Sequence, residues 1–140
     1  FDAINEGIKL SKEYYGKFGE KTTEPKVYEQ VGNAVNLLRG KTLNEAMLII
    51  PEKIGVSWFA RETIPGAFAN YVTVDNPEDS SLLSMRCGGD NETVPEIVCA
   101  FLGAEKGPNI FSEKIIQKIN EKNNINTYEM AEKLIKKINL

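Results

Sequence analysis

Residues 87–93 contain the one stretch in the chain where flexible backbone meets closely spaced oxygen donors. The two glycines, Gly88 and Gly89, let the backbone adopt positive φ or approach a ligand without a Cβ penalty. Two carboxylates and a hydroxyl follow, from Asp90, Glu92 and Thr93. Such oxygen ligands suit Mg²⁺, Mn²⁺ or Ca²⁺ rather than zinc. The stretch therefore predicts half of a divalent-metal site.

The same residues also have a purely structural interpretation. Asp90 is a suitable N-cap for a helix that follows it, and Gly88 and Gly89 are a common helix stop. Three donors fall short of the roughly six oxygens that a hard ion needs, and the acids at 75–79 are better explained as turn and first-turn residues. The calcium-loop pattern of an EF-hand is not in the sequence. From the residues alone, both interpretations stay open.

The composition excludes several kinds of site. The chain has no histidine and two cysteines, Cys87 and Cys99, so it cannot build a zinc finger or a histidine-dependent triad by itself. Two thiols in a chain of this size are typical of free cysteines in a reducing compartment, and a single disulfide between them stays open. We therefore expect a cytoplasmic protein.

Charge and hydropathy limit the partners. The net charge of -3, from 17 basic and 20 acidic residues, gives no general attraction for nucleic acid or an anionic membrane. The lysines near the end of the chain lie among glutamates, which is typical of a solvated helix face. No apolar run approaches the roughly 20 residues that span a bilayer, and no signal-peptide pattern opens the chain. We expect neither nucleic acid nor a membrane as partner.

The apolar spacing predicts helices in the first half of the chain, over residues 2–18, 25–40, 42–50 and 56–74, with the entry into the second at residues 22–25. Thr42 and Glu45 have the spacing of a capping box at the third helix start. Pro51 should end that helix at Ile50, and Pro65 should bend or split the fourth helix.

Four further helices are predicted to begin at the capping residues Asn76, Asp90, Ser112 and Thr127. Pro95 lies about one turn into the second of these and should distort its start. Glycines at 103 and 107 should end it. No convincing strand alternation appears, so 140 residues predict one all-α domain with a compact, orthogonal helical arrangement.

The apolar faces of these predicted helices also indicate which side chains are buried. Trp58 and Phe59 are possible stacking surfaces for a substrate, but aromatics at helical spacing are more often core residues. The last helix should direct an apolar face inward, made of Met130, Ala131, Leu134, Ile135 and Ile138.

The spacing of the central stretch resembles the C-terminal signature of the ADP-ribosylglycohydrolase family. That signature reads Gly-Gly-Asp-x-Asp-Thr, then an apolar helix, then Gly-Ala-x-x-Gly. The chain has Gly-Gly-Asp-Asn-Glu-Thr at 88–93 and Gly-Ala-Glu-Lys-Gly at 103–107, with a run at 62–67 similar to the family's preceding helix. The resemblance covers about residues 27 to 110. Glu92 stands where the family has its second Asp, and Pro95 stands where it has a small helix former.

The resemblance implies an all-helical fold with two Mg²⁺ ions in a cleft that binds ADP-ribose, Mn²⁺ being the alternative ion. The implied reaction is hydrolysis of the glycosidic bond between ADP-ribose and an arginine, serine or other acceptor, so the partner would be ADP-ribose or an ADP-ribosylated protein. Asp90, Glu92 and Thr93 would be metal ligands, with Asp90 and Glu92 catalytic, and Gly88 and Gly89 would allow close approach of the substrate.

Three hypotheses follow. The first is that residues 1–140 are the C-terminal portion of a larger hydrolase domain, since Phe1 begins in mid-pattern and the family's early acidic motifs are not in the chain. This chain alone would then be inactive. The second is an inactive relative that acts as a binding or scaffold module. The third is a homo-oligomer that completes the cleft, because exposed apolar faces drive association.

Overall fold

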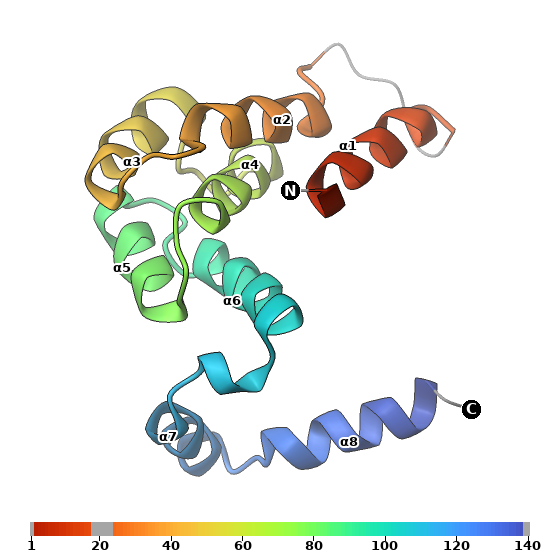
Figure 1. The fold of residues 1–140 in the computed structure, drawn as a ribbon, viewed down its shortest axis with the longest axis vertical. Helices are drawn as coiled ribbons and strands as arrows, with labels where there is room; N and C mark the ends of the chain where they lie inside the picture. Colours follow the sequence, from red (N-terminus) through yellow and green to blue (C-terminus); the bar gives the residue numbers. More distant parts are fainter. Residues whose placement is uncertain (1, 18–23, 139–140) are drawn as a thin grey trace.

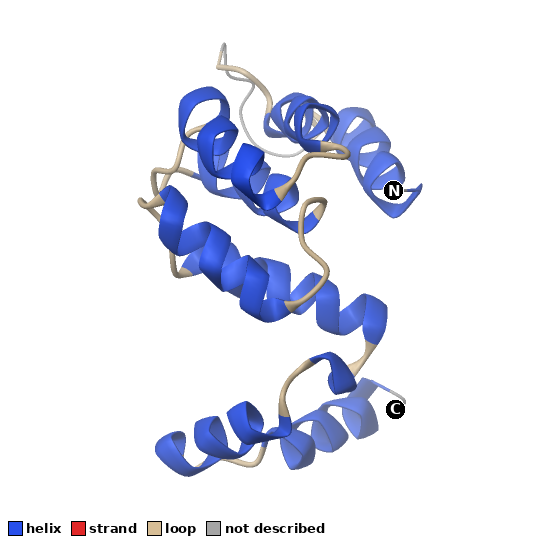
Figure 2. Cartoon of the chain, turned by 60° about the vertical axis from the view of Figure 1, so that its left-hand side comes forward, coloured by secondary structure: helices blue, strands red, loops and turns tan. Residues whose placement is uncertain are grey.

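The computed structural model describes residues 2–17 and 24–138, and every regular element within them is a helix (Figures 1 and 2). The predicted all-α class is confirmed. The predicted entry into the second helix at 22–23 lies outside the described residues. The elements are α1 (Asp2–Tyr14), α2 (Val27–Leu38), α3 (Leu43–Ile49), η1 (Ile50–Ile54), α4 (Ala60–Tyr71), α5 (Pro77–Cys87), α6 (Thr93–Lys106), η2 (Pro108–Ile110), α7 (Glu113–Asn123) and α8 (Thr127–Ile138).

Helix α4 is the centre of the body. It packs against α2 on one side and α6 on another, with α5 next to α6. The small residues Gly66, Ala67 and Ala69 of α4 are buried, which lets neighbouring backbones approach closely. The main core joins side chains of α2 to α6, including Leu38, Ala46, Leu83, Val98 and Leu102, and a smaller cluster joins α1 to α2 through Ile4, Val31 and Val35.

Two helix starts form as their sequences predict. In the capping box of α3, the Glu45 amide donates to Thr42 Oγ1 over 3.3 Å and the Thr42 amide donates to Glu45 Oε2 over 2.9 Å. The bond from the Thr42 amide, followed by one from Lys41, lowers the pKa of Glu45 to about 2. At α5, the Asp79 amide donates to Asn76 Oδ1 over 2.8 Å, with Pro77 at the first position.

Three prolines lie within helical elements. Helix α3 ends at Ile49, one residue before the predicted end at Ile50, but the helical path continues through Pro51 into η1. Pro65 lies inside one continuous helix, α4, rather than between two pieces. Pro95 is the third residue of α6, so its missing donor falls among the amides that have no intrahelical partner.

The prediction that Trp58 and Phe59 are core residues was wrong. Helix α4 begins at Ala60, so both rings lie in the loop before it and are 82% and 54% exposed. They contact each other edge to face, with centroids 6.3 Å apart. A helix boundary placed four residues too early assigned them to an apolar face that they do not occupy.

The start of α8 differs from prediction, and the end of α6 matches one of the two predicted stops. Helix α6 continues past Gly103 to Lys106, and Gly107, whose φ is 81°, ends it. Asn126 rather than Thr127 caps α8, since the Glu129 amide donates to Asn126 Oδ1 over 3.1 Å. Ser112 precedes α7, but its side chain makes no capping bond.

Helices α7 and α8 extend away from the body in both views (Figures 1 and 2). The inward apolar face predicted for the last helix was wrong, because Met130, Ala131, Leu134, Ile135 and Ile138 are all exposed, Ile138 by 72%. The helix is amphipathic, but nothing in the described part of the chain covers its apolar stripe. The predicted compactness therefore holds for α2 to α6 and not for the last two helices.

Candidate metal and substrate site

Two glycines with positive φ turn the chain between α5 and α6. Gly88 ends α5, its amide donating to Ser84 O over 3.1 Å, with φ at 76°. Gly89 follows with φ at 66°, and a Cβ there would collide with the carbonyl of Val56. The backbone passes so close to Val56 that only glycine fits, which is the structural reason for the second glycine.

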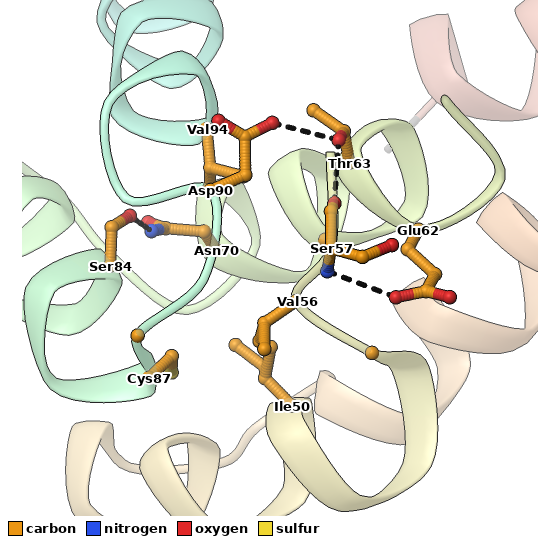
Figure 3. A pocket seen from close by; sticks show the side chains of 13 residues that line it. Ile50, Val56, Ser57, Glu62, Thr63, Asn70, Ser84, Cys87, Asp90 and Val94 are labelled. Carbon is orange, nitrogen blue, oxygen red and sulfur yellow. Dashed lines mark hydrogen bonds between the residues drawn. The ribbon is translucent and has the colours of Figure 1, made fainter. Parts of the chain in front are cut away.

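Asp90 is held by contacts from three segments. Its amide donates to Val56 O over 2.7 Å. Its Oδ1 accepts from the Thr93 amide over 3.3 Å. Its Oδ2 accepts from Thr63 Oγ1 over 2.9 Å (Figure 3). Hydrogen bonds from the Thr93 side chain, then from Thr63, lower the pKa of Asp90 despite partial burial. The carboxylate is thus ionised and fixed in orientation.

The loop at 55–57 braces this turn. The Ser57 amide donates to Glu62 Oε2 over 2.9 Å, and Thr63 Oγ1 lies 3.0 Å from Ser57 O (Figure 3). Glu62 and Thr63, consecutive residues of α4, therefore hold the amide and the carbonyl of Ser57. Hydrogen bonds to Glu62 from the Ser57 hydroxyl and then from the Ser57 amide lower the pKa of Glu62. Since Val56 accepts from the Asp90 amide, the loop connects α4 to the glycine turn.

A small cavity of about 20 Å³ lies among these residues (Figure 3). That volume has room for about one water molecule. Asn70, which is 1% exposed, donates through Nδ2 to Ser80 O and Ser84 Oγ, while its Oδ1 has no partner. Burial raises the pKa of the Cys87 thiol, which also lines the cavity, so this sulfur is a protonated, poor metal ligand. The polar lining comes from Ser57, Glu62, Thr63, Asn70, Ser84 and Asp90.

The structure brings some of the predicted site residues together and not others. Asp90 and Thr93 meet through the hydrogen bonds of the turn, and Gly88 has open space where a Cβ would lie. Glu92 is exposed and, within the described residues, has no hydrogen-bond or ion-pair partner. Asp90 accepts from the amide of Thr93, the first residue of α6, as the structural interpretation expects of it, although the residue directly before the helix is Glu92, whose side chain makes no capping bond.

The donor set fits a hard divalent ion in kind. Around Asp90 the available ligands are oxygens, from a carboxylate, two threonine hydroxyls and the Ser57 carbonyl, which are the ligands that Mg²⁺ and Mn²⁺ prefer. In number the set is small, since no group of three or more His, Cys, Asp or Glu side chains among the described residues gathers at a common point. The metal roles of Asp90, Glu92 and Thr93 stay predictions.

Sequence reasoning missed the residues that support Asp90. Thr63, Glu62 and Ser57 lie about 30 positions upstream, and their contacts follow from the packing of α4. The one available signal was the run at 62–67, which carried part of the family resemblance without any role for its members.

A second, larger hollow of about 910 Å³ lies between α1, α2, α4 and α6. Its aromatic wall includes Phe68, Tyr71 and Phe101, whose rings contact one another. Tyr71 donates its hydroxyl to Glu105 Oε2 over 2.9 Å, and burial together with this carboxylate raises the pKa of the phenol. This hollow and the glycine turn are lined by different residues.

Among the described residues, no helix combines the length and apolar character that crossing a membrane requires. A family model described as ADP-ribosylglycohydrolase matches residues 2–140. None of the curated proteins and none of the solved structures compared with the chain matches it.

Proposed function

Because the chain belongs to the ADP-ribosylglycohydrolase family, a family of hydrolases, we propose that it serves the metal-dependent hydrolysis of the glycosidic bond between ADP-ribose and an acceptor residue. One observation carries the proposal. The carboxylate of Asp90 stays partly accessible and ionised while three segments fix its position. A carboxylate that served only as a helix cap would not need the bond from Thr63.

The proposed roles follow from these positions. Asp90, Glu92 and Thr93 would hold an Mg²⁺ ion, or Mn²⁺ in its place. When bound, the ion would supply Lewis-acid and orienting effects at the ribose. Gly88 leaves open space beside the carboxylate for the substrate, while Gly89 brings the turn onto Val56. ADP-ribose or an ADP-ribosylated protein is the proposed partner.

The remaining oxygen ligands come from outside this turn. Mg²⁺ is commonly bound by one or two carboxylates and keeps several waters or substrate phosphate oxygens, so Asp90 and Glu92 are a sufficient carboxylate contribution. For the second ion of the proposed pair, ligands come from residues beyond 1–140 or from a second copy of the chain.

One observation favours a second candidate function, a binding module without catalysis. Glu92 is one methylene longer than the aspartate of the family signature, and it has no partner that fixes its position among the described residues. A mobile carboxylate is a poorer ligand for an ion that demands near-octahedral geometry.

Calorimetric titration of the full-length chain with Mn²⁺ separates the two functions. We expect binding by the wild type, loss of binding in Asp90→Asn and weaker binding in Glu92→Gln. Asparagine remains a good N-cap, so Asp90→Asn keeps the fold. Glu45→Gln removes another ionised capping carboxylate, one whose partners are Lys41 and Thr42 rather than residues of the turn. It is the matched control and should bind like the wild type.

Release of ADP-ribose from an ADP-ribosylated peptide by the complete natural protein then tests catalysis. If the protein is a hydrolase, we expect Mn²⁺-dependent release that Asp90→Asn abolishes. Retained Mn²⁺ binding without any release would support the binding module, and binding that Asp90→Asn leaves unchanged would refute the metal role itself.

A further inference from the structure

The Thr63 hydroxyl occupies an unusual position for a helix residue. A threonine in or next to a helix commonly bonds the carbonyl one turn earlier, and Thr73, two residues past the end of α4, does so, donating to Ala69 O over 2.8 Å. Thr63 instead directs its hydroxyl out of its own helix. Its Oγ1 lies 2.9 Å from Asp90 Oδ2 and 3.0 Å from Ser57 O.

These two contacts compete for one hydrogen. A hydroxyl has a single hydrogen and two lone pairs, whereas a carboxylate and a carbonyl both only accept. The hydrogen favours ionised Asp90, because a charge-assisted bond is the stronger of the two.

Burial makes the arrangement specific. Thr63 is 6% exposed, so water does not readily replace the hydroxyl, and a branched Cβ restricts its rotation. The contact joins α4 to a residue 27 positions later. Asp90 therefore cannot rotate about its side-chain bonds without breaking a bond to a rigid, central helix.

We propose that Thr63 is a positioning residue for the divalent-ion site, holding the Asp90 carboxylate in the orientation that binds the ion. The inference rests on the proposed function, since it assigns Thr63 a part in that same site. Hydrogen-bond partners of ligating carboxylates typically change metal affinity by about 10 to 100-fold when they are removed, so the effect is large enough to measure.

The test compares Mn²⁺ affinities of full-length variants by calorimetry, with circular dichroism to establish folding. Thr63→Val keeps the shape and removes the hydroxyl, and we expect about 10-fold weaker binding. Thr63→Ser restores the hydroxyl and should restore affinity. Thr73→Val removes the hydroxyl that bonds Ala69 O just after the same helix and should bind like the wild type. If Thr63→Val does not fold, Thr63→Ala takes its place in the comparison.

The outcomes distinguish this inference from the proposed function. Wild-type affinity in folded Thr63→Val, or equal weakening in Thr63→Ser and Thr63→Val, would overturn the positioning role and leave the metal site standing. An absence of Mn²⁺ binding by the wild type would overturn both.

Discussion

Two capping carboxylates, Glu45 and Asp90, differ in how far their partners lie along the chain. Each carboxylate accepts a hydrogen bond from a backbone amide at a helix start, and each has a lowered pKa. The partners of Glu45 are Thr42 and Lys41, within four residues on an exposed surface. Asp90 has the same kind of local bond to Thr93, but its second oxygen is bound by Thr63 from another helix.

The difference separates a helix cap from a candidate site. A cap needs one oxygen and neighbours in its own first turn. The Asp90 carboxylate also accepts a hydrogen bond from the buried Thr63 hydroxyl, and the Asp90 amide donates to Val56 O in the loop before α4. These additional contacts fix the direction of the carboxylate. A cap needs only one oxygen directed at an amide of the first turn, whereas a metal ligand gains affinity when partners fix the whole carboxylate. Glu45 and Asp90 are therefore a matched pair for experiment.

The largest expected effect comes from Gly89→Ala compared with Gly40→Ala. Both glycines have similar positive φ, 66° and 71°, but a Cβ at Gly40, close to the Glu45 cap, meets no atom within 4 Å, whereas one at Gly89 collides with Val56. We expect Gly40→Ala to cost about 1 kcal/mol of unfolding free energy and Gly89→Ala about 3 kcal/mol, through added overpacking. Urea unfolding measures both.

Equal costs for the two substitutions would contradict the close approach of the turn to Val56. The backbone at Gly89 would then have as much room for a side chain as the backbone at Gly40, and the hydrogen bond from the Asp90 amide to Val56 O would no longer help to fix Asp90.

Local features of this chain could be predicted and long-range ones could not. The Thr42 capping box, the Asn76 cap and the Gly88 stop all formed, because each pairs residues within a few positions of one another. The resemblance likewise found Asp90 from a contiguous motif. No periodicity indicates that Thr63 meets Asp90, since that contact depends on how α4 packs against the turn.

The wrong predictions share a physical cause. An apolar stripe indicates that one face of a helix avoids water, but not what covers it, so the face of α8 was placed inward although it is exposed. Trp58 was assigned to a helix that starts after it. In both cases, local spacing was used to infer burial, which is a property of the tertiary fold.

An intermediate loss of stability is expected from Glu62→Gln, which tests how α4 holds the loop at residues 55–57. Hydrogen bonds to charged groups contribute more than neutral ones, so losing the charge that accepts from the Ser57 amide should cost about 1 kcal/mol. Glu52→Gln, which affects an exposed ion pair to Lys53, is the control and should change stability by less than about 0.5 kcal/mol. Urea unfolding at neutral pH compares them.

The pH profile sharpens that result. Because the folded pKa of Glu62 is lowered, its contribution is present above the unfolded pKa and is lost as the pH falls through the folded one. Glu62→Gln should therefore flatten part of the acid side of the stability curve. A variant curve parallel to that of the wild type would mean that Ser57 is not held by an ionised carboxylate.

The smallest effect belongs to the exposed cap. Thr42→Ala removes the hydroxyl that accepts from the Glu45 amide and should cost about 1 kcal/mol or less. Since the pKa of Glu45 falls from 4.5 to about 2 in the folded chain, its stabilisation is complete above pH 4.5 and disappears as the pH falls to about 2. Glu45→Gln should remove this pH dependence, while Thr42→Ala should keep most of it, because the Thr42 amide is the largest cause of the shift. Thermal unfolding across this pH range measures both, and neither variant should alter Mn²⁺ affinity, since every partner of this carboxylate lies in its own turn.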